Sequence, residues 1–114
     1  MITLIHHKNL TTERWFRFSL IEQMANVGSE VGRALKWRNL GKEETSQLAF
    51  ERALELLILT VEDPKNRRRL KELLRVRAGF ADYFAGKNEF NTTEKWWEDY
   101  FYQFGYAAAI QRGR

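Results

Sequence analysis

The chain has 114 residues, of which 44% are hydrophobic and 30% are charged, and this balance is typical of a folded globular domain. It contains no cysteine, which excludes disulfide bonds, thiolate metal sites and a cysteine nucleophile. The formal net charge is +4 at pH 7, and a modestly basic surface favours anionic partners such as nucleic acid. No apolar run has the length of a secretory signal core or a membrane span, so we expect a cytoplasmic protein without a membrane partner.

The beginning of the chain differs from the rest. Met1 to Ile5 are mostly apolar, and this run ends at His6, His7 and Lys8. Terminal segments of this kind are often mobile unless they pack on the domain. We therefore expect an N-terminal arm over residues 1–11, followed by one helical domain over residues 12–111.

A long first helix is predicted over residues 12–39. Apolar residues recur at spacings of four and three from Phe16 to Leu35, which is the pattern of one helical face. Thr11 or Thr12 can accept a hydrogen bond at its start, and Gly41 can end it in the left-handed conformation.

A second helix is predicted over residues 43–62. Its main apolar seam runs from Phe50 to Val61, but Leu48 and Leu59 point to the opposite side. A helix that is apolar on more than one side usually lies centrally or meets another subunit. Leu48 and Leu59 are therefore interface candidates.

Two more helices are predicted in the remainder of the chain. Asp63 and Pro64 form a favourable helix start, with aspartate as the N-cap, and this helix should end at Ala85 before Gly86. The last helix should begin near Thr92. Because the connections are short, neighbouring helices should be antiparallel. The predicted fold is all-α, an antiparallel up-down-up-down four-helix bundle with a short N-terminal arm.

Basic residues cluster at the start of the third predicted helix. On a helical wheel Arg67, Arg68, Lys71 and Arg75 fall within about 100° of one another, away from the apolar face. Such a stripe can bind phosphates with a steep dependence on salt. The alternative is a solvated face that pairs with Glu72 and with acids of the second helix.

Arg77 is a second candidate, because it falls among the apolar residues of the same helix. A buried guanidinium needs a carboxylate and further acceptors. Arg77 therefore indicates an anion site inside the bundle or at a subunit interface, a structural ion pair, or a side chain that reaches solvent along its stem. The sequence does not choose among its acidic partners, Glu22, Glu30, Glu51 and Glu55.

Two further features indicate helix or subunit contacts. Gly28 and Gly32 make a smooth strip that a second helix can approach closely, either within the chain or from a partner. Several aromatic residues fall off the main seams, which favours an oligomer or partner surface, or else a wide core. These residues are Trp15, Trp37, Trp96, Tyr102 and Tyr106.

Catalytic and metal sites have little support. The only histidines are His6 and His7, so neither a histidine triad nor the Glu-X-X-His pairs of di-iron bundles can form in the domain. No glycine-rich phosphate loop is present. Glu22 and Glu30 share one helix and could act as acid and base, but surface carboxylates are the simpler interpretation. We expect no metal, no cofactor and no enzymatic activity.

Three stretches carry a resemblance: WFRFSLIEQMANVGSEVGRALKW, AFERALELLILTVEDP with RLKEL, and DYFAGKNEFNTTEKWWEDYFYQFGYAA. Over about residues 13–110 they resemble a group of small uncharacterised prokaryotic helical-bundle proteins. More distantly, the organisation is similar to the four-helix-bundle proteins of 23S rRNA intervening sequences and to HEPN-type bundles. That resemblance implies oligomerisation and RNA association. HEPN ribonucleases use an arginine followed by a histidine on a late helix, and no histidine follows His7 here, so their activity is not implied.

Three functional hypotheses follow. The first is a non-enzymatic helical-bundle protein that self-associates, most simply as a dimer, and works through protein contacts. The second is a nucleic-acid-binding module, with RNA as the expected ligand, that uses the basic stripe. The third is an enzyme with a carboxylate–arginine site around Arg77.

Overall fold

The computed structural model describes residues 10–113, and all regular secondary structure in this part of the chain is helical. The elements are α1 (Thr12–Phe16), α2 (Leu20–Asn39), α3 (Glu43–Glu62), the 3-10 helix η1 (Pro64–Arg69), α4 (Leu70–Ala85) and α5 (Glu94–Arg112). The prediction of an all-helical fold is confirmed for these residues. Most of the expected N-terminal arm, residues 1–9, lies outside the described residues.

The first helix is shorter than predicted, because the chain breaks between α1 and α2. Ser19 caps α2: its hydroxyl accepts a hydrogen bond from the backbone N–H of Glu22 at 3.1 Å, and the Glu22 carboxylate accepts one from the N–H of Ser19 at 3.0 Å. This reciprocal capping box satisfies two N–H groups that a helix start leaves free. The apolar spacing continues across the break and so concealed it.

The predicted third helix is divided in the structure. Asp63 acts as the predicted N-cap and accepts a hydrogen bond from the backbone N–H of Lys65 at 3.1 Å. The turns that follow Pro64 are 3-10 rather than α-helical, and α4 begins only at Leu70. Its end at Ala85, with Gly86 as the C-cap residue, agrees with the prediction.

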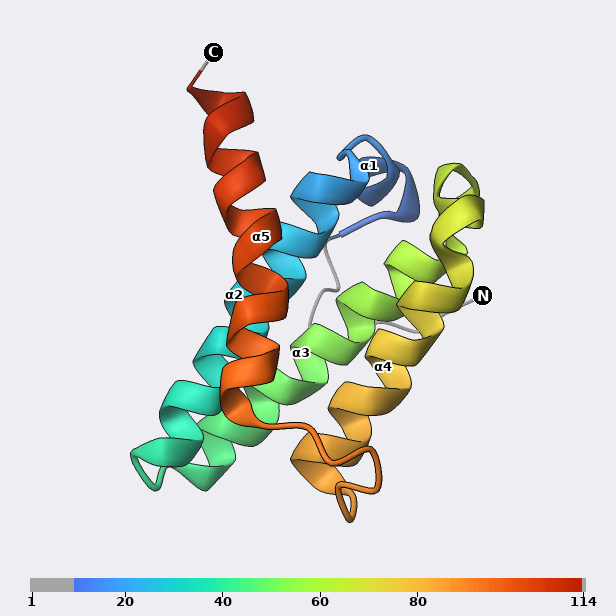
Figure 1. The fold of residues 1–114 in the computed structure, drawn as a ribbon. Coiled ribbons are helices and arrows are strands. Elements are labelled where there is room, and N and C mark those ends of the chain that lie inside the picture. The colour runs from blue at the N-terminus through green and yellow to red at the C-terminus, as the bar shows by residue number, and fades with distance from the viewer. Residues whose placement is uncertain (1–9, 114) are drawn as a thin grey trace.

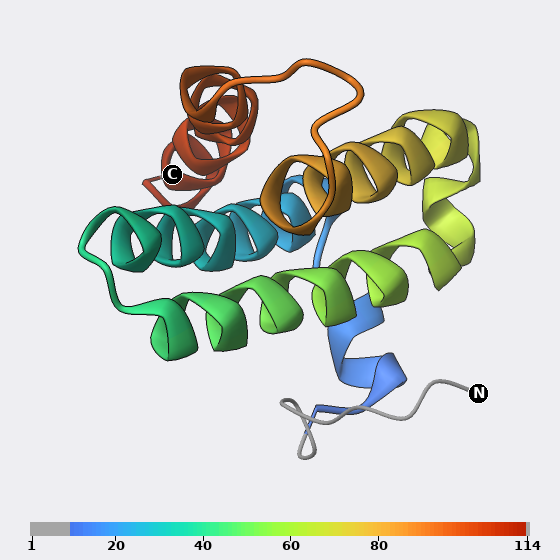
Figure 2. The same ribbon diagram turned by 90° about the horizontal axis from the view of Figure 1, so that it is seen from below.

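α2 and α3 are the central helices, and each of them packs against two other long helices. α3 packs against both α2 and α4, and α2 packs against both α3 and α5. α2, α3 and α4 run antiparallel to their neighbours along the chain, whereas α5 crosses α2 obliquely (Figures 1 and 2). The end of α4 and the start of α5 lie close together at the loop that joins them, and the two helices diverge from there (Figure 1).

One hydrophobic core holds α2, α3, α4 and α5 together. Met24, Val27, Leu57, Phe80 and Trp97 are its most deeply buried large residues. The central position of α3 explains why it is apolar on more than one side.

Candidate nucleic-acid interface

A groove of about 990 Å³ opens between α4 and the first turns of α5. Its volume lies at the upper end of the range found for ligand sites in proteins, about 300–1,000 Å³. Basic residues come from η1 and α4, and aromatic residues come from α5 and the loop before it. The charged and aromatic lining residues are Arg68, Arg69, Lys71, Glu72, Arg75, Phe90, Trp96, Trp97 and Tyr100.

Three cations that line the groove have no ion-pair partner among the residues that the structure describes. Arg69 forms an ion pair with Glu72, with hydrogen bonds of 2.9 and 3.0 Å. Arg68, Lys71 and Arg75 are exposed and form no ion pair with any acidic residue in the described part of the chain. Glu72 therefore pairs with Arg69, which is not a member of the basic stripe, and three members of the stripe are exposed without an acidic partner among residues 10–113.

Trp97 forms the floor of the groove and joins α5 to α4. Its ring is 1% exposed and packs edge-on against Phe80 with ring centroids 5.3 Å apart. A Cβ atom at Gly79 would lie only 3.3 Å from the Trp97 ring, so glycine allows the close approach of the two helices. The Trp97 indole N–H donates a hydrogen bond to the Thr92 hydroxyl at 2.8 Å.

A hydrogen bond joins α5 to α4 beside this floor. The Tyr100 hydroxyl donates a hydrogen bond to Glu72 at 2.6 Å. Burial, and then the hydrogen bond to the Glu72 carboxylate, raise the pKa of Tyr100 above its ordinary value. The phenol therefore keeps its proton, and the bond persists through the physiological pH range.

Trp96 provides an aromatic surface at the groove wall. Its ring lies parallel to that of Tyr100, with 1° between the planes and 5.6 Å between the centroids. Trp96 also lines the groove and keeps 48% of its surface exposed. One side of the indole is thus supported by Tyr100, and the ring is still accessible to a ligand.

The loop over residues 86–93 presents another aromatic residue, Phe90. The Asp82 carboxylate accepts hydrogen bonds from the backbone N–H groups of Glu89 at 2.9 Å and Phe90 at 3.0 Å. Asn88 and Asn91 adopt left-handed conformations, with φ of 55° and 57°, which asparagine tolerates better than most residues. Phe90 is 65% exposed and lines the groove. The asparagines of this segment are a sequence signal of tight turns, but no sequence pattern shows that Phe90 lines the groove.

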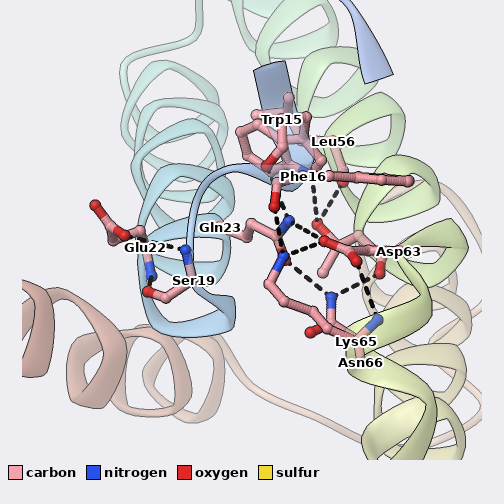
Figure 3. Close-up of polar contacts among 10 residues, drawn as sticks. Trp15, Phe16, Ser19, Glu22, Gln23, Leu56, Asp63, Lys65 and Asn66 are labelled. Atoms are coloured by element: carbon pink, nitrogen blue, oxygen red, sulfur yellow. Dashed lines mark hydrogen bonds and ion pairs between the residues drawn. The ribbon is translucent and has the colours of Figure 1, made fainter. Parts of the chain in front are cut away.

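A buried polar cluster lies at the junction of α1, α2 and η1, away from the groove (Figure 3). The Gln23 amide donates to Asp63 at 2.8 Å and to the Trp15 carbonyl at 3.0 Å, and its oxygen accepts from Asn66 at 2.9 Å. Asn66 donates a second hydrogen bond to the Thr60 carbonyl at 2.9 Å. Both amide side chains therefore use their donors within the protein, as buried polar groups must.

Asp63 belongs to the same cluster. Burial would raise the pKa of the Asp63 carboxyl, but the hydrogen bonds from Lys65 and Gln23 outweigh it and hold the pKa below its ordinary value. The Lys65 ammonium also donates to the Phe16 carbonyl at 3.0 Å. Because these contacts are directed at one another, the cluster is a structural junction rather than a ligand site.

The structure also corrects two interface candidates and one buried-charge candidate. Trp15 is 3% exposed and Leu59 is 2% exposed, so both belong to the core and neither can form a surface. Arg77 is exposed and does not line the groove, which contradicts a buried guanidinium and agrees with the alternative of a side chain that reaches solvent. The contact face of α4 is narrower than its apolar pattern indicated: Leu73 and Phe80 are buried, while Leu74 is 46% exposed.

The remaining candidates have mixed placements. Leu48 is exposed, and Trp37 is half-buried beneath the Lys36 ammonium, which lies 5.5 Å from its ring centroid. A Cβ at Gly28 would lie 3.0 Å from the Cβ of Phe101, so Gly28 serves close packing of α2 against α5 within the chain. Gly32 has nothing within 4 Å of such a Cβ.

The other candidates are exposed. Arg67, a member of the basic stripe, lies outside the groove, and the remaining aromatic candidates are Tyr102 and Tyr106.

The carboxylates considered for catalysis are engaged elsewhere. Hydrogen bonds from the backbone N–H of Ser19, and then with its hydroxyl, lower the pKa of Glu22, whereas the Glu30 carboxylate forms an ion pair with Arg33 at 2.5 Å.

Within residues 10–113 no group of three or more acidic or histidine side chains is placed so that it could hold a metal ion. None of the helices described combines the length and the apolar character needed to cross a membrane.

Comparison with known proteins leaves the groove to be interpreted from its own chemistry. Neither a family model, nor a curated protein, nor a solved structure matches the chain, and the resemblance inferred from the sequence stays a prediction.

Proposed function

We propose that the protein binds nucleic acid in the groove between α4 and α5. The observation that carries this proposal is the placement of three unpaired cations, Arg68, Lys71 and Arg75, beside the exposed ring of Trp96. Cations at the edge of a groove attract a phosphate backbone, and aromatic rings receive its bases. Among the described residues that line the groove, the single acidic one is Glu72, and Arg69 and Tyr100 already bond it.

The test is a charge reversal of the groove cations. In a variant carrying Arg68→Glu, Lys71→Glu and Arg75→Glu, binding of a fluorescent oligonucleotide should disappear. In the unaltered protein, three phosphate contacts should make binding about 20- to 40-fold weaker when salt rises from about 50 to about 200 mM. Fluorescence anisotropy measures both effects.

The matched control reverses three exposed cations outside the groove, with Arg17→Glu, Lys42→Glu and Arg77→Glu. It changes the net charge of the protein by the same amount, so it should retain most of the binding if the groove is the site. Equal loss in both variants would show that only net charge matters and would contradict the proposal. Equally strong competition by poly-glutamate of matched charge would point instead to an acidic protein partner.

Self-association through α5 is the second proposal. Tyr102, Tyr106 and Ile110 are exposed at spacings of four residues on one face of the helix, and the two tyrosine rings stack with centroids 6.1 Å apart. The C-terminal turns of α5 project past α2 (Figure 1). An uncharged stripe of this kind suits the same stripe of a second copy, related by a two-fold axis. Light scattering should then give a dimer mass at high micromolar concentration, and a monomer mass would contradict this proposal.

A further inference from the structure

We propose that the groove takes single-stranded rather than duplex nucleic acid, with one base stacked on the indole of Trp96. This inference rests on the proposed function and specifies its ligand. Bases of a duplex are stacked and paired, and they offer only their edges to a protein. A base from a single strand can offer its face, which is what an aromatic ring binds.

The support behind Trp96 makes it suitable as a stacking surface. Tyr100 lies parallel to it, and the Tyr100 hydroxyl is bonded to Glu72 on α4. Trp97, the next residue, is buried and packs edge-on against Trp96 at 4.7 Å between centroids. A ring that is already held in place loses little conformational freedom when a base stacks on it.

The rest of the lining fits bases better than duplex edges. Phe90 offers a second exposed ring from the loop, and the apolar residues Leu74, Val76 and Ala78 contribute from α4. The cations Lys71 and Arg75 lie on α4 with these apolar residues, and Arg68 lies on the adjoining η1, so charge and apolar surface are adjacent. Because every base has a face that can stack on an aromatic ring, binding should depend little on base sequence.

The experiment compares four probes on the unaltered protein by fluorescence anisotropy: single-stranded RNA, single-stranded DNA, a duplex, and an abasic strand that keeps every phosphate. Each probe is about 10 nucleotides long, within the range of known single-strand sites. At least one base-containing strand should bind about 5- to 150-fold more tightly than the abasic strand, since this is the usual contribution of one stacked base. The duplex should also bind more weakly than that strand.

Two substitutions locate the effect. Trp96→Ala should remove the difference between the base-containing and abasic strands, whereas Trp96→Phe keeps a ring and should keep most of it. Leu40→Ala, at an exposed position outside this groove, should leave it unchanged. Equal binding of abasic and base-containing strands, or an undiminished difference in Trp96→Ala, would overturn the inference while phosphate binding in the groove still stands. If no probe binds, the proposed function itself fails.

Discussion

Replacing Trp97 by alanine should lower the free energy of unfolding by about 3–5 kcal/mol, the usual cost of deleting a large aromatic side chain from a core. Trp97 packs against Phe80 and Phe101, and its N–H bonds Thr92. The substitution removes these contacts and leaves a cavity that α4 and α5 can close only by moving together. It should also loosen the groove, because Trp97 is its floor.

Urea denaturation followed by circular dichroism measures this loss. Leu40→Ala is the control: the side chain is large and apolar, but it is 60% exposed. Its substitution should change stability by no more than about 0.5 kcal/mol. If Trp97→Ala cost as little as the control, the proposed junction between α4 and α5 would be incorrect.

Replacing Gln23 by leucine should destabilise the protein by about 2–4 kcal/mol. The two side chains have similar volume, but leucine provides none of the three hydrogen bonds that Gln23 makes to Asp63, Asn66 and the Trp15 carbonyl. A buried polar group left without a partner costs about 1–3 kcal/mol, and more when it is charged. Part of this cost is offset by the apolar side chain that is gained.

The control for this substitution is Gln47→Leu on α3. Gln47 is exposed, and its amide bonds only Glu51 among the contacts described, at 3.1 Å. Its replacement should change the free energy of unfolding by about 0.5 kcal/mol or less. Equal effects of the two substitutions would show that the buried cluster has no special role in stability.

The fold could be predicted from the sequence where local signals and the hydrophobic pattern agreed. The bounds of α3 matched because its apolar pattern begins and ends at clear polar boundaries, and Gly86 marked the end of α4. The break before Ser19 was missed because apolar spacing continues through it, although Ser19 and Glu22 have the spacing of a capping box. The oblique crossing of α5 depends on which side chains meet in three dimensions, such as Gly28 with Phe101, and no local pattern encodes it.

The candidate site was predicted in part. Arg68, Lys71 and Arg75 could be identified because cations at helical spacing are visible in the sequence, and Trp96 was recognised as lying off the main seam. The sequence could not show that these residues line one groove, because they come from segments that tertiary contacts bring together, such as the packing of Trp97 on Gly79 and the bond from Tyr100 to Glu72. The expectation of a buried Arg77 failed because its position on the helical wheel is apolar, whereas Arg77 and the nearby Leu74 are exposed on α4.

The most direct test of the proposed site follows the four tryptophan indole N–H signals by nuclear magnetic resonance while a single-stranded oligonucleotide is added. The Trp96→Phe variant assigns the Trp96 signal, since that signal alone disappears. The proposal predicts a large shift of the Trp96 signal and a small one for Trp15, which is buried at the polar cluster and donates its N–H to Thr60. Binding that leaves the Trp96 signal in place would contradict a nucleic-acid site in the groove between α4 and α5.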